Sequence, residues 1–277
     1  MSADHGIDPR TTLGELVAER PARAELFECW GLDYCCGGRQ TLRDACAKRG
    51  LDLASVHDAL AALEAGERAS ANLEGVDWRE APIAELCAHI VTVHHDGLRE
   101  AFPRIQHLFA TVVRVHGASE PRLRDAQRIF GEIQTELQPH LASEETELFP
   151  ACVAWAQNGT PVDPGILGEH EDEHAAVGAA LAPLRILCQD FDRATALCRT
   201  HGALLDALEA FEQDLHRHVH EENNVLFARV RNARATPPAP PRHAQSEGEP
   251  GETLLPCCEG WIGEQTHRWA GQRPQTA

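Results

Sequence analysis

One pattern occurs twice in this chain, as His140-Leu-Ala-Ser-Glu144-Glu-Thr-Glu-Leu148-Phe149 and as His218-Val-His-Glu-Glu222-Asn-Asn-Val-Leu226-Phe227. In each copy a glutamate follows a histidine by four residues. On an α-helix this spacing places the two side chains one turn apart on one face, where an imidazole and a carboxylate can reach a common point. The pattern therefore predicts two helices that present the same chemistry, with a metal ion as the candidate occupant of that point.

The apolar residues around each pattern indicate which face of the helix it occupies. Residues at spacings of three and four form one stripe through Phe130, Ile133, Leu137, His140, Glu144 and Leu148, and another through Leu204, Leu208, Phe211, Leu215, His218, Glu222 and Leu226. Each His–Glu pair lies within its stripe and is expected to be buried. Burying an unpaired carboxylate costs on the order of several kcal/mol, so a coordinated cation is favoured. A metal-free His–Glu hydrogen-bond network is the alternative.

Composition narrows the classes of function. The 277 residues include 25 lysines and arginines against 43 acidic residues, a formal charge of −18, which argues against a nucleic-acid partner and an anionic membrane surface. The chain lacks a basic leader followed by an apolar run, and no apolar stretch approaches about eighteen residues, so we expect a soluble cytoplasmic protein. The ten cysteines show no regular disulfide framework, which favours reduced thiols.

A small helical domain is expected over residues 1–70. Capping and turn residues divide residues 11–65 into short helices that cannot form a large core. Between two of them lies Gly31-Leu-Asp-Tyr-Cys-Cys-Gly-Gly38, whose paired glycines allow a tight turn that presents two adjacent thiols. Cys35 and Cys36 are therefore candidates for ligation or reaction, and a purely structural role is the alternative.

Four longer helices are expected over residues 71–235, at about 78–102, 121–156, from 165 onward, and 194–233. In the first, two apolar traces that differ by one residue are nearly equally good, so the pattern leaves open whether His94 or His95 faces inward. In the third, His170 and His174 share one stripe, and the pattern does not decide which of them ligates. Each of the four helices therefore offers at least one inward histidine.

Two further segments lie outside the expected helices. Residues 65–77 contain glycines and small polar residues and are expected to be a linker. Consecutive prolines after residue 235 favour an extended conformation, so we expect a disordered tail over residues 236–277, which holds Cys257 and Cys258.

Four amphipathic helices with short connections imply an antiparallel bundle whose inward residues meet in the middle. The centre then receives histidines from all four helices and glutamates from two. Oxygen and nitrogen ligands without cysteine suit iron or manganese, whereas a structural zinc site more often uses thiolates. Because two carboxylates among four imidazoles can each bridge two ions, we interpret the site as a di-iron centre.

The chain resembles a known family at several motifs. These are Asp-Tyr-Cys-Cys-Gly-Gly at 33–38, His-His-Asp at 94–96, His140-x3-Glu144 with Leu-Phe-Pro after it, Glu173-His174, and His218-x3-Glu222 with Asn-Asn-Val-Leu-Phe after it. Over roughly residues 11–233 the chain resembles the di-iron Repair of Iron Centres family, which restores damaged iron–sulfur clusters. The resemblance implies an all-α fold, in which a hemerythrin-like antiparallel four-helix bundle follows a small helical N-terminal domain.

The resemblance also implies roles for individual residues. The terminal iron ligands would be His95, His140, His174 and His218, and the glutamates that bridge two iron ions would be Glu144 and Glu222. The thiols of Cys35 and Cys36 would cooperate with the iron site. This chain departs from the family where His94 replaces a residue that is usually aromatic, and His170 is an additional candidate ligand.

The function implied by the family is repair of clusters damaged by oxidative or nitrosative stress, either by iron donation or by removal of nitric oxide. Its partners would be damaged iron–sulfur proteins and small ligands such as NO or O2. The alternative is an oxygen or iron sensor or store of the hemerythrin type, which is favoured if His94 or His170 also ligates. A metal-free bundle is a third possibility. The sequence leaves open a homodimer and whether turnover is enzymatic.

Overall fold

A computed structural model describes residues 7–69 and 76–232 of the chain. All regular elements in these residues are helices, and Thr12 and Thr41 form an isolated β-bridge. The expected all-α fold is therefore confirmed. The predicted tail at 236–277 and residues 70–75 of the predicted linker lie outside the described residues. Residues 65–69, which were also predicted as linker, are helical instead.

The N-terminal region folds into four short helices, α1 (Leu13–Glu19), α2 (Arg23–Cys29), α3 (Leu42–Arg49) and α4 (Leu53–Ala69). Thr12 caps α1 in a reciprocal capping box with Glu15, and Thr41 caps α3. Gly50 ends α3 in the left-handed conformation, at φ 69°, which a residue without Cβ adopts at little cost. The sequence signals for short capped helices are thus present in the structure.

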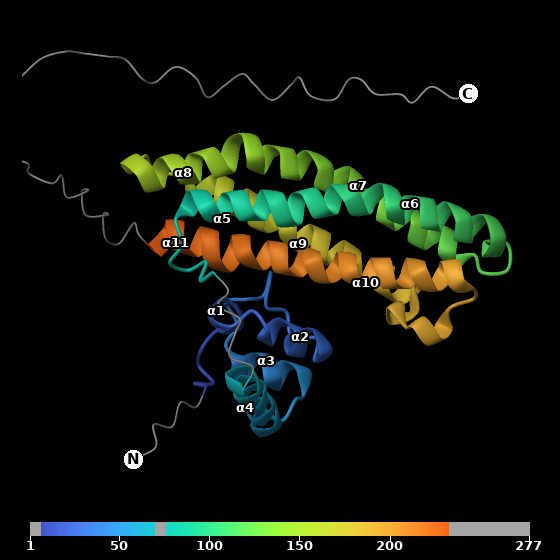
Figure 1. Ribbon diagram of the computed structural model, residues 1–277, viewed down its shortest axis with the longest axis horizontal. Coiled ribbons are helices and arrows are strands. Elements are labelled where there is room, and N and C mark those ends of the chain that lie inside the picture. Colours follow the sequence, from blue (N-terminus) through green and yellow to red (C-terminus); the bar gives the residue numbers. More distant parts are fainter. Residues whose placement is uncertain (1–6, 70–75, 233–277) are drawn as a thin grey trace, which may run out of the picture. The chain divides into compact units, whose positions relative to one another are not determined.

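Four longer helical rods follow and run antiparallel side by side (Figure 1). The first rod consists of α5 (Ile83–His89), η1 (Ile90–His95) and α6 (Asp96–His116). The second consists of α7 (Arg122–Ser143), η2 (Glu144–Leu148) and α8 (Phe149–Asn158), and the third is α9 (Pro164–Leu187). Two 3-10 turns, η3 (Gln189–Phe191) and η4 (Arg193–Thr195), lead to the fourth rod, α10 (Arg199–His220), η5 (Glu221–Leu226) and α11 (Phe227–Asn232). Helix α6 packs against α7 and α10, and α7 packs against α9. Arg185 of α9 pairs with Glu212 of α10, which completes the expected four-helix bundle.

The predicted bounds of two of the rods are wrong. The first rod was expected over 78–102 but spans 83–116, and it continues through Pro103 because Ile105, Phe109 and Val112 extend its buried stripe. The last rod begins at Arg199 rather than near 194, because residues 193–195 form a separate 3-10 turn. In the first rod, burial of the apolar face thus outweighs the helix-breaking tendency of Pro103.

Three of the four rods contain a π-helical turn, and these turns are η1, η2 and η5. A π-turn inserts one extra residue into an α-helix and shifts the buried face by that residue. In the first rod Ile83 and Cys87 are buried before the turn and Ile90 at its first position, whereas Leu98 and Phe102 are buried after it. Each of the two competing apolar traces in the sequence is therefore correct for one half of this rod.

The apolar core consists of two clusters. One joins α1–α3 and part of α4 with the apolar stripes of α6, α7, α9 and α10, including Phe102, Phe130 and Phe211. The other joins α5, α8 and α11 with residues around Leu148 and Leu167. Along all four rods, buried histidines and glutamates lie between these clusters. The polar site is thus bounded on both sides by packed apolar side chains.

Candidate metal centre

The structure brings the six predicted metal ligands together in the middle of the bundle. They form two groups, one of His95, Glu144, His218 and Glu222 and the other of His140, Glu144, His174 and Glu222. Within each group the potential donor atoms lie within 4.8 Å of one another. All six side chains are buried, and both glutamates have no exposed surface. The two groups share the same two carboxylates.

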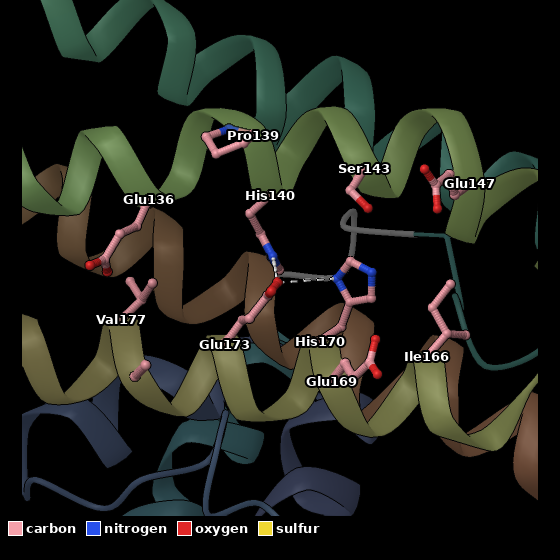
Figure 2. Close-up of a pocket in the computed structure, with 11 residues that line it drawn as sticks. Glu136, Pro139, His140, Ser143, Glu147, Ile166, Glu169, His170, Glu173 and Val177 are labelled. Atoms are coloured by element: carbon pink, nitrogen blue, oxygen red, sulfur yellow. Dashed lines mark hydrogen bonds and ion pairs between the residues drawn. The ribbon is translucent and has the colours of Figure 1, made fainter.

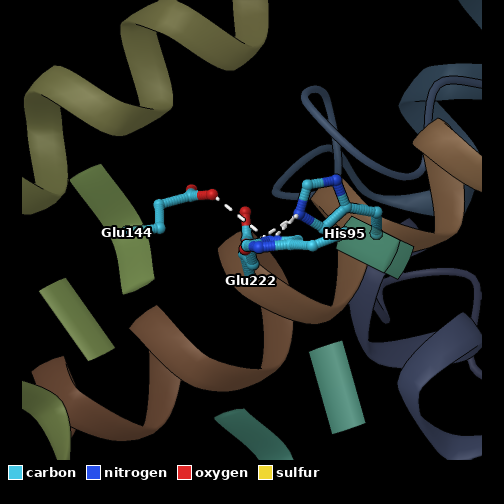
Figure 3. Close-up of side chains that lie close together, drawn as sticks. His95, Glu144 and Glu222 are labelled. Atoms are coloured by element: carbon cyan, nitrogen blue, oxygen red, sulfur yellow. Dashed lines mark hydrogen bonds and ion pairs between the residues drawn. The ribbon is translucent and has the colours of Figure 1, made fainter. Parts of the chain in front are cut away.

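Each shared carboxylate places one oxygen toward each group. Glu144 Oε1 lies 3.0 Å from His140 Nε2, and its Oε2 lies 3.4 Å from His95 Nε2. Glu222 Oε2 lies 3.0 Å from His174 Nε2, and its Oε1 lies 3.7 Å from His95 Nε2. Figure 3 shows Glu144, Glu222 and His95 converging on one point. Neighbouring donors of an octahedral ion with bonds of about 2.1 Å stand about 3.0 Å apart, so these separations suit coordination.

Three of the four imidazoles are oriented by a hydrogen bond at Nδ1. These contacts join His95 to Glu145 at 2.7 Å, His140 to Glu173 at 2.6 Å, and His174 to Asn223 Oδ1 at 3.0 Å. Because each partner atom is an acceptor, Nδ1 carries the proton and Nε2 presents a lone pair to the centre. Metal-ligating histidines typically show this arrangement.

The polar atoms at the centre are poorly satisfied by the protein alone. Both oxygens of Glu144 and Oε2 of Glu222 are buried without a hydrogen-bond partner. In addition, Nε2 of His95 lies 3.1 Å from Nε2 of His218, so two nitrogens face each other. Buried carboxylates and facing lone pairs are costly without a cation. The donor set therefore fits metal ions.

The electrostatics of the centre favour ionised carboxylates. Burial raises the pKa of Glu144, but the surrounding imidazoles outweigh burial and lower it to about 2. Burial likewise opposes ionisation of Glu222, and its neighbouring imidazoles hold its pKa well below the usual range. Burial lowers the pKa of His95, whereas the nearby carboxylates raise it further than burial lowers it. In the absence of metal the centre therefore attracts protons, which a bound cation would replace.

The two additional histidines occupy different surroundings. His170 Nδ1 lies 3.5 Å from Glu144 Oε1 and has no hydrogen-bond partner, so it borders the second group. His94 points elsewhere, with Nδ1 bonded to Asp214 at 2.8 Å. The pair His116 and Glu120, which has the same spacing as the two main motifs, lies outside the centre, and His116 contacts Cys198.

A cavity of about 590 Å³ opens between α7 and α9 beside His140 and His170. Figure 2 shows both imidazoles and Glu173 directed toward one another. Three further glutamates line the cavity, namely Glu136, Glu147 and Glu169. Because its charged lining is acidic, the cavity favours entry of cations toward this side of the centre.

The predicted turn with adjacent thiols contacts the bundle directly. Asn224 Nδ2 in η5 donates hydrogen bonds to the carbonyl oxygens of Tyr34 and Cys35, at 3.1 and 2.8 Å. A Cβ at Gly38 would collide with Asn224 Oδ1, so only glycine fits there. The thiol of Cys36 lies 3.6 Å from the carbonyl oxygen of His174. The thiols therefore lie next to the backbone of a candidate ligand.

The two thiols differ in acidity. The hydrogen bond from Cys35 to Cys36 lowers the pKa of Cys36, because it stabilises the thiolate there. The same bond, together with burial, raises the pKa of Cys35 well above its usual value. Cys36 is thus the more readily ionised sulfur. All described cysteines are free thiols, as expected.

Several residues of the site were missed in the sequence. Glu145 and Asn223 immediately follow candidate ligands, and Asn224 fixes the thiol-bearing turn. The tendency of ligating imidazoles to bond a carboxylate predicts that such partners exist, but spacing does not identify them. The π-turns have no sequence signal comparable to a proline or a glycine.

Comparison with known proteins is consistent with this site. Residues 9–64 match ScdA_N, a domain of unknown function, and residues 88–230 match the Hemerythrin HHE cation binding domain. An iron–sulfur cluster repair protein YtfE of Edwardsiella ictaluri is 35% identical over 218 residues, which cover 79% of this chain and 95% of that protein. Proteins of the same name from Yersinia pseudotuberculosis and Yersinia pestis are each 34% identical over 220 residues, covering 79% of this chain and 96% of those proteins. Among the described residues, no helix combines the length and apolarity needed to cross a bilayer.

Proposed function

Because this chain belongs to the Repair of Iron Centres family of iron–sulfur cluster repair proteins, we propose that it restores damaged clusters with two iron ions held in its bundle. Its proposed partners are damaged iron–sulfur proteins, with NO and O2 as small ligands and the cytoplasm as compartment. A homodimer and the division of the chain near residues 70 and 235 stay predictions.

The proposed terminal ligands are His95, His140, His174 and His218, and the proposed bridges are Glu144 and Glu222. One observation supports this assignment most strongly: each carboxylate directs one oxygen to each of two histidine groups. A single ion would need only one group. Two groups that share both carboxylates match two ions with two bridges.

Bound iron would supply exchangeable positions for a small ligand and a source of iron for a damaged cluster. The residues of this chain determine how that chemistry is used. Glu145, Glu173 and Asn223 hold three imidazoles in the ligating tautomer, and the two apolar clusters restrict water at the site. The acidic cavity beside His140 is the proposed route for cations.

The proposed role of Cys35 and Cys36 is a relay between the iron site and the partner. Cys36 is the more acidic thiol and lies beside the backbone of His174, so it is placed to bind a soft metal ion or react with NO. Cys35 donates its hydrogen bond to Cys36 and would stabilise the thiolate.

The central experiment combines metal analysis with a repair assay. The purified protein is expected to hold about two irons per chain and to reactivate an iron–sulfur enzyme damaged by nitric oxide. Glu144→Gln and Glu222→Gln are expected to loosen the metal, because an amide is a weaker ligand that cannot bridge as an anion. If both variants keep full iron and an unchanged absorption spectrum, the bridging assignment is wrong. If the unaltered protein fails to reactivate the enzyme, repair itself is contradicted.

A sensor or store remains the second candidate, and the position of His170 supports it. Its unpartnered Nδ1 lies 3.5 Å from Glu144 Oε1, close enough to join the donor set after a small movement. The repair proposal expects His95→Ala and His174→Ala to lose iron, whereas His94→Ala and His170→Ala largely retain it. Iron loss in the latter pair, with retention in the former, would favour the sensor or store.

A further inference from the structure

A second set of metal-ligating side chains lies beside the proposed iron ligands. It consists of His89 from α5, His94 from η1 and Glu221 from η5. Glu221 Oε2 lies 3.4 Å from His89 Nε2 and 3.5 Å from His94 Nε2. All three donor atoms lie within 4.8 Å of one another, and none belongs to the six residues assigned above.

The separations within this set suit a small cation. Two donors at about 2.1 Å from an ion with tetrahedral geometry stand about 3.4 Å apart. Both distances from Glu221 to the histidines are close to that value. A direct hydrogen bond between imidazole and carboxylate would bring these atoms nearer to 2.8 Å, as between His94 and Asp214. The distances from Glu221 to the two imidazoles therefore fit a metal ion bound between these atoms better than a direct hydrogen bond.

Two of the three donor atoms have no other partner. His94 Nε2 and Glu221 Oε2 are both buried without a hydrogen bond, and only 4% of His94 is exposed. Because Nδ1 of His94 donates to Asp214, Nε2 faces Glu221 with a proton or, in the neutral imidazole, with a lone pair. This arrangement repeats the one in which Glu145 orients His95. A lone pair that faces a carboxylate oxygen is unfavourable unless a proton or a cation lies between them.

The set is also reachable from solvent. The side chains of His89 and Glu221 are 24% and 17% exposed, whereas that of His94 is 5% exposed. Trp78 stacks on His89 with ring centroids 4.3 Å apart, which restricts the orientation of that imidazole. An ion could thus enter past His89 and Glu221 and be held against the buried His94.

We propose that His89, His94 and Glu221 bind one divalent transition-metal ion, separate from the iron pair. Two imidazoles and one carboxylate leave coordination positions open and suit Fe(II), among other divalent ions. His94 and Glu221 directly precede the proposed ligands His95 and Glu222 in the sequence, so the new site adjoins the centre. The role of this site rests on the proposed function: it holds an iron ion that moves to or from the proposed iron pair.

Zinc is the probe for this site. Full-length protein is loaded with iron to constant content and then dialysed against increasing Zn(II), and both metals are counted per chain by elemental analysis. The expected result is about one additional zinc without loss of iron, and at least about tenfold weaker zinc binding in His89→Ala. His107→Ala, which removes an exposed histidine elsewhere, is expected to bind zinc like the unaltered protein.

Glu221→Gln provides a second variant, in which the same loss of zinc affinity is expected with the imidazoles retained. Equal zinc binding by His89→Ala and the unaltered protein overturns the proposal. Zinc uptake that displaces iron one for one also overturns it, because the zinc then occupies the centre. If the protein takes up no iron but binds one zinc through His89, the di-iron proposal fails and the separate site stands.

Discussion

The layer of candidate ligands and the phenylalanine cluster farther along the same helices are held together differently. In the cluster, Phe130 lies with its ring centroid 5.4 Å from that of Phe211 and 5.7 Å from that of Phe109, inside regular α-helices. In the ligand layer, three of the four rods form π-turns and several buried polar atoms lack partners. The side chains of the apolar layer are packed without a ligand, whereas the unpartnered polar atoms of the ligand layer would be satisfied by a bound cation. Stability and metal binding should therefore be separable by mutation.

The largest effect is expected in the apolar layer. Phe130→Ala removes a fully buried ring and should lower the free energy of unfolding by about 3–5 kcal/mol, because a cavity remains. Iron content per folded chain should stay unchanged, since the ring contacts other apolar rings. Chemical denaturation and iron analysis of the same preparation measure both quantities. Val115→Ala, at a residue that is 61% exposed, is the control. Loss of iron in folded Phe130→Ala would show that the two layers are not independent.

The ligand layer should respond to metal in a way that the apolar layer does not. Replacing both shared glutamates, as Glu144→Gln/Glu222→Gln, removes the two carboxylates that would hold the cation, so the variant should lose the stabilisation that iron gives to the folded protein. Added iron should stabilise the unaltered protein by about 3 kcal/mol at a hundredfold excess over its dissociation constant and leave the variant unchanged. Thermal melts with and without chelator measure this difference. A variant that iron stabilises as much as the unaltered protein would contradict it.

A smaller effect is expected from the residues that orient the imidazoles. Asn223→Ala removes the hydrogen bond to Nδ1 of His174 and should weaken metal binding about 10–100-fold, without a comparable loss of stability. Competition with a chelator of known affinity measures the change. Asn232→Ala, at the end of α11, is a matched amide control. Equal loss in both variants would assign the effect to the helix rather than to the hydrogen bond.

The smallest effect on either layer is expected from the thiols. Cys35→Ser/Cys36→Ser should leave iron content and the spectrum of the centre intact, because neither sulfur belongs to the two ligand groups. Reactivation of a nitric-oxide-damaged enzyme should nevertheless become slower, since the proposed relay is gone. Cys29→Ser, at an exposed thiol, serves as control. Equal rates for all three proteins would eliminate the relay.

The sequence predicts the fold and the inward residues well because both depend on periodicity. The stripes around His140 and His218 are buried as expected, and all six candidate ligands converge. Periodicity failed at the first rod, where the extra residue of η1 buries both His94 and His95. No single helical period describes a helix that contains such an insertion, so periodicity left the choice between the two histidines to the family resemblance. In the structure His95, and not His94, belongs to one of the two groups that share Glu144 and Glu222.

The contacts between the N-terminal helices and the bundle could not be predicted from the sequence, for another reason. Asn224 reaches a turn about 190 residues earlier in the chain, and Arg39 pairs with Glu171 in α9. Neither pair shows a local pattern. Such contacts depend on how helices pack, which propensity and spacing do not determine.

Three consecutive residues of η5 each make a different contact. Glu222 supplies oxygens to both histidine groups, Asn223 orients His174, and Asn224 holds the Cys35 turn. Each residue of an α-helix is rotated about 100° from the one before it. Deleting one residue here would replace the π-turn by a regular α-helical turn and change the directions of these three side chains relative to one another, so the three contacts could not all be kept. This segment should therefore tolerate neither a change in length nor replacement of these three residues, and libraries of single-residue deletions selected for iron binding should show a gap at residues 221–226.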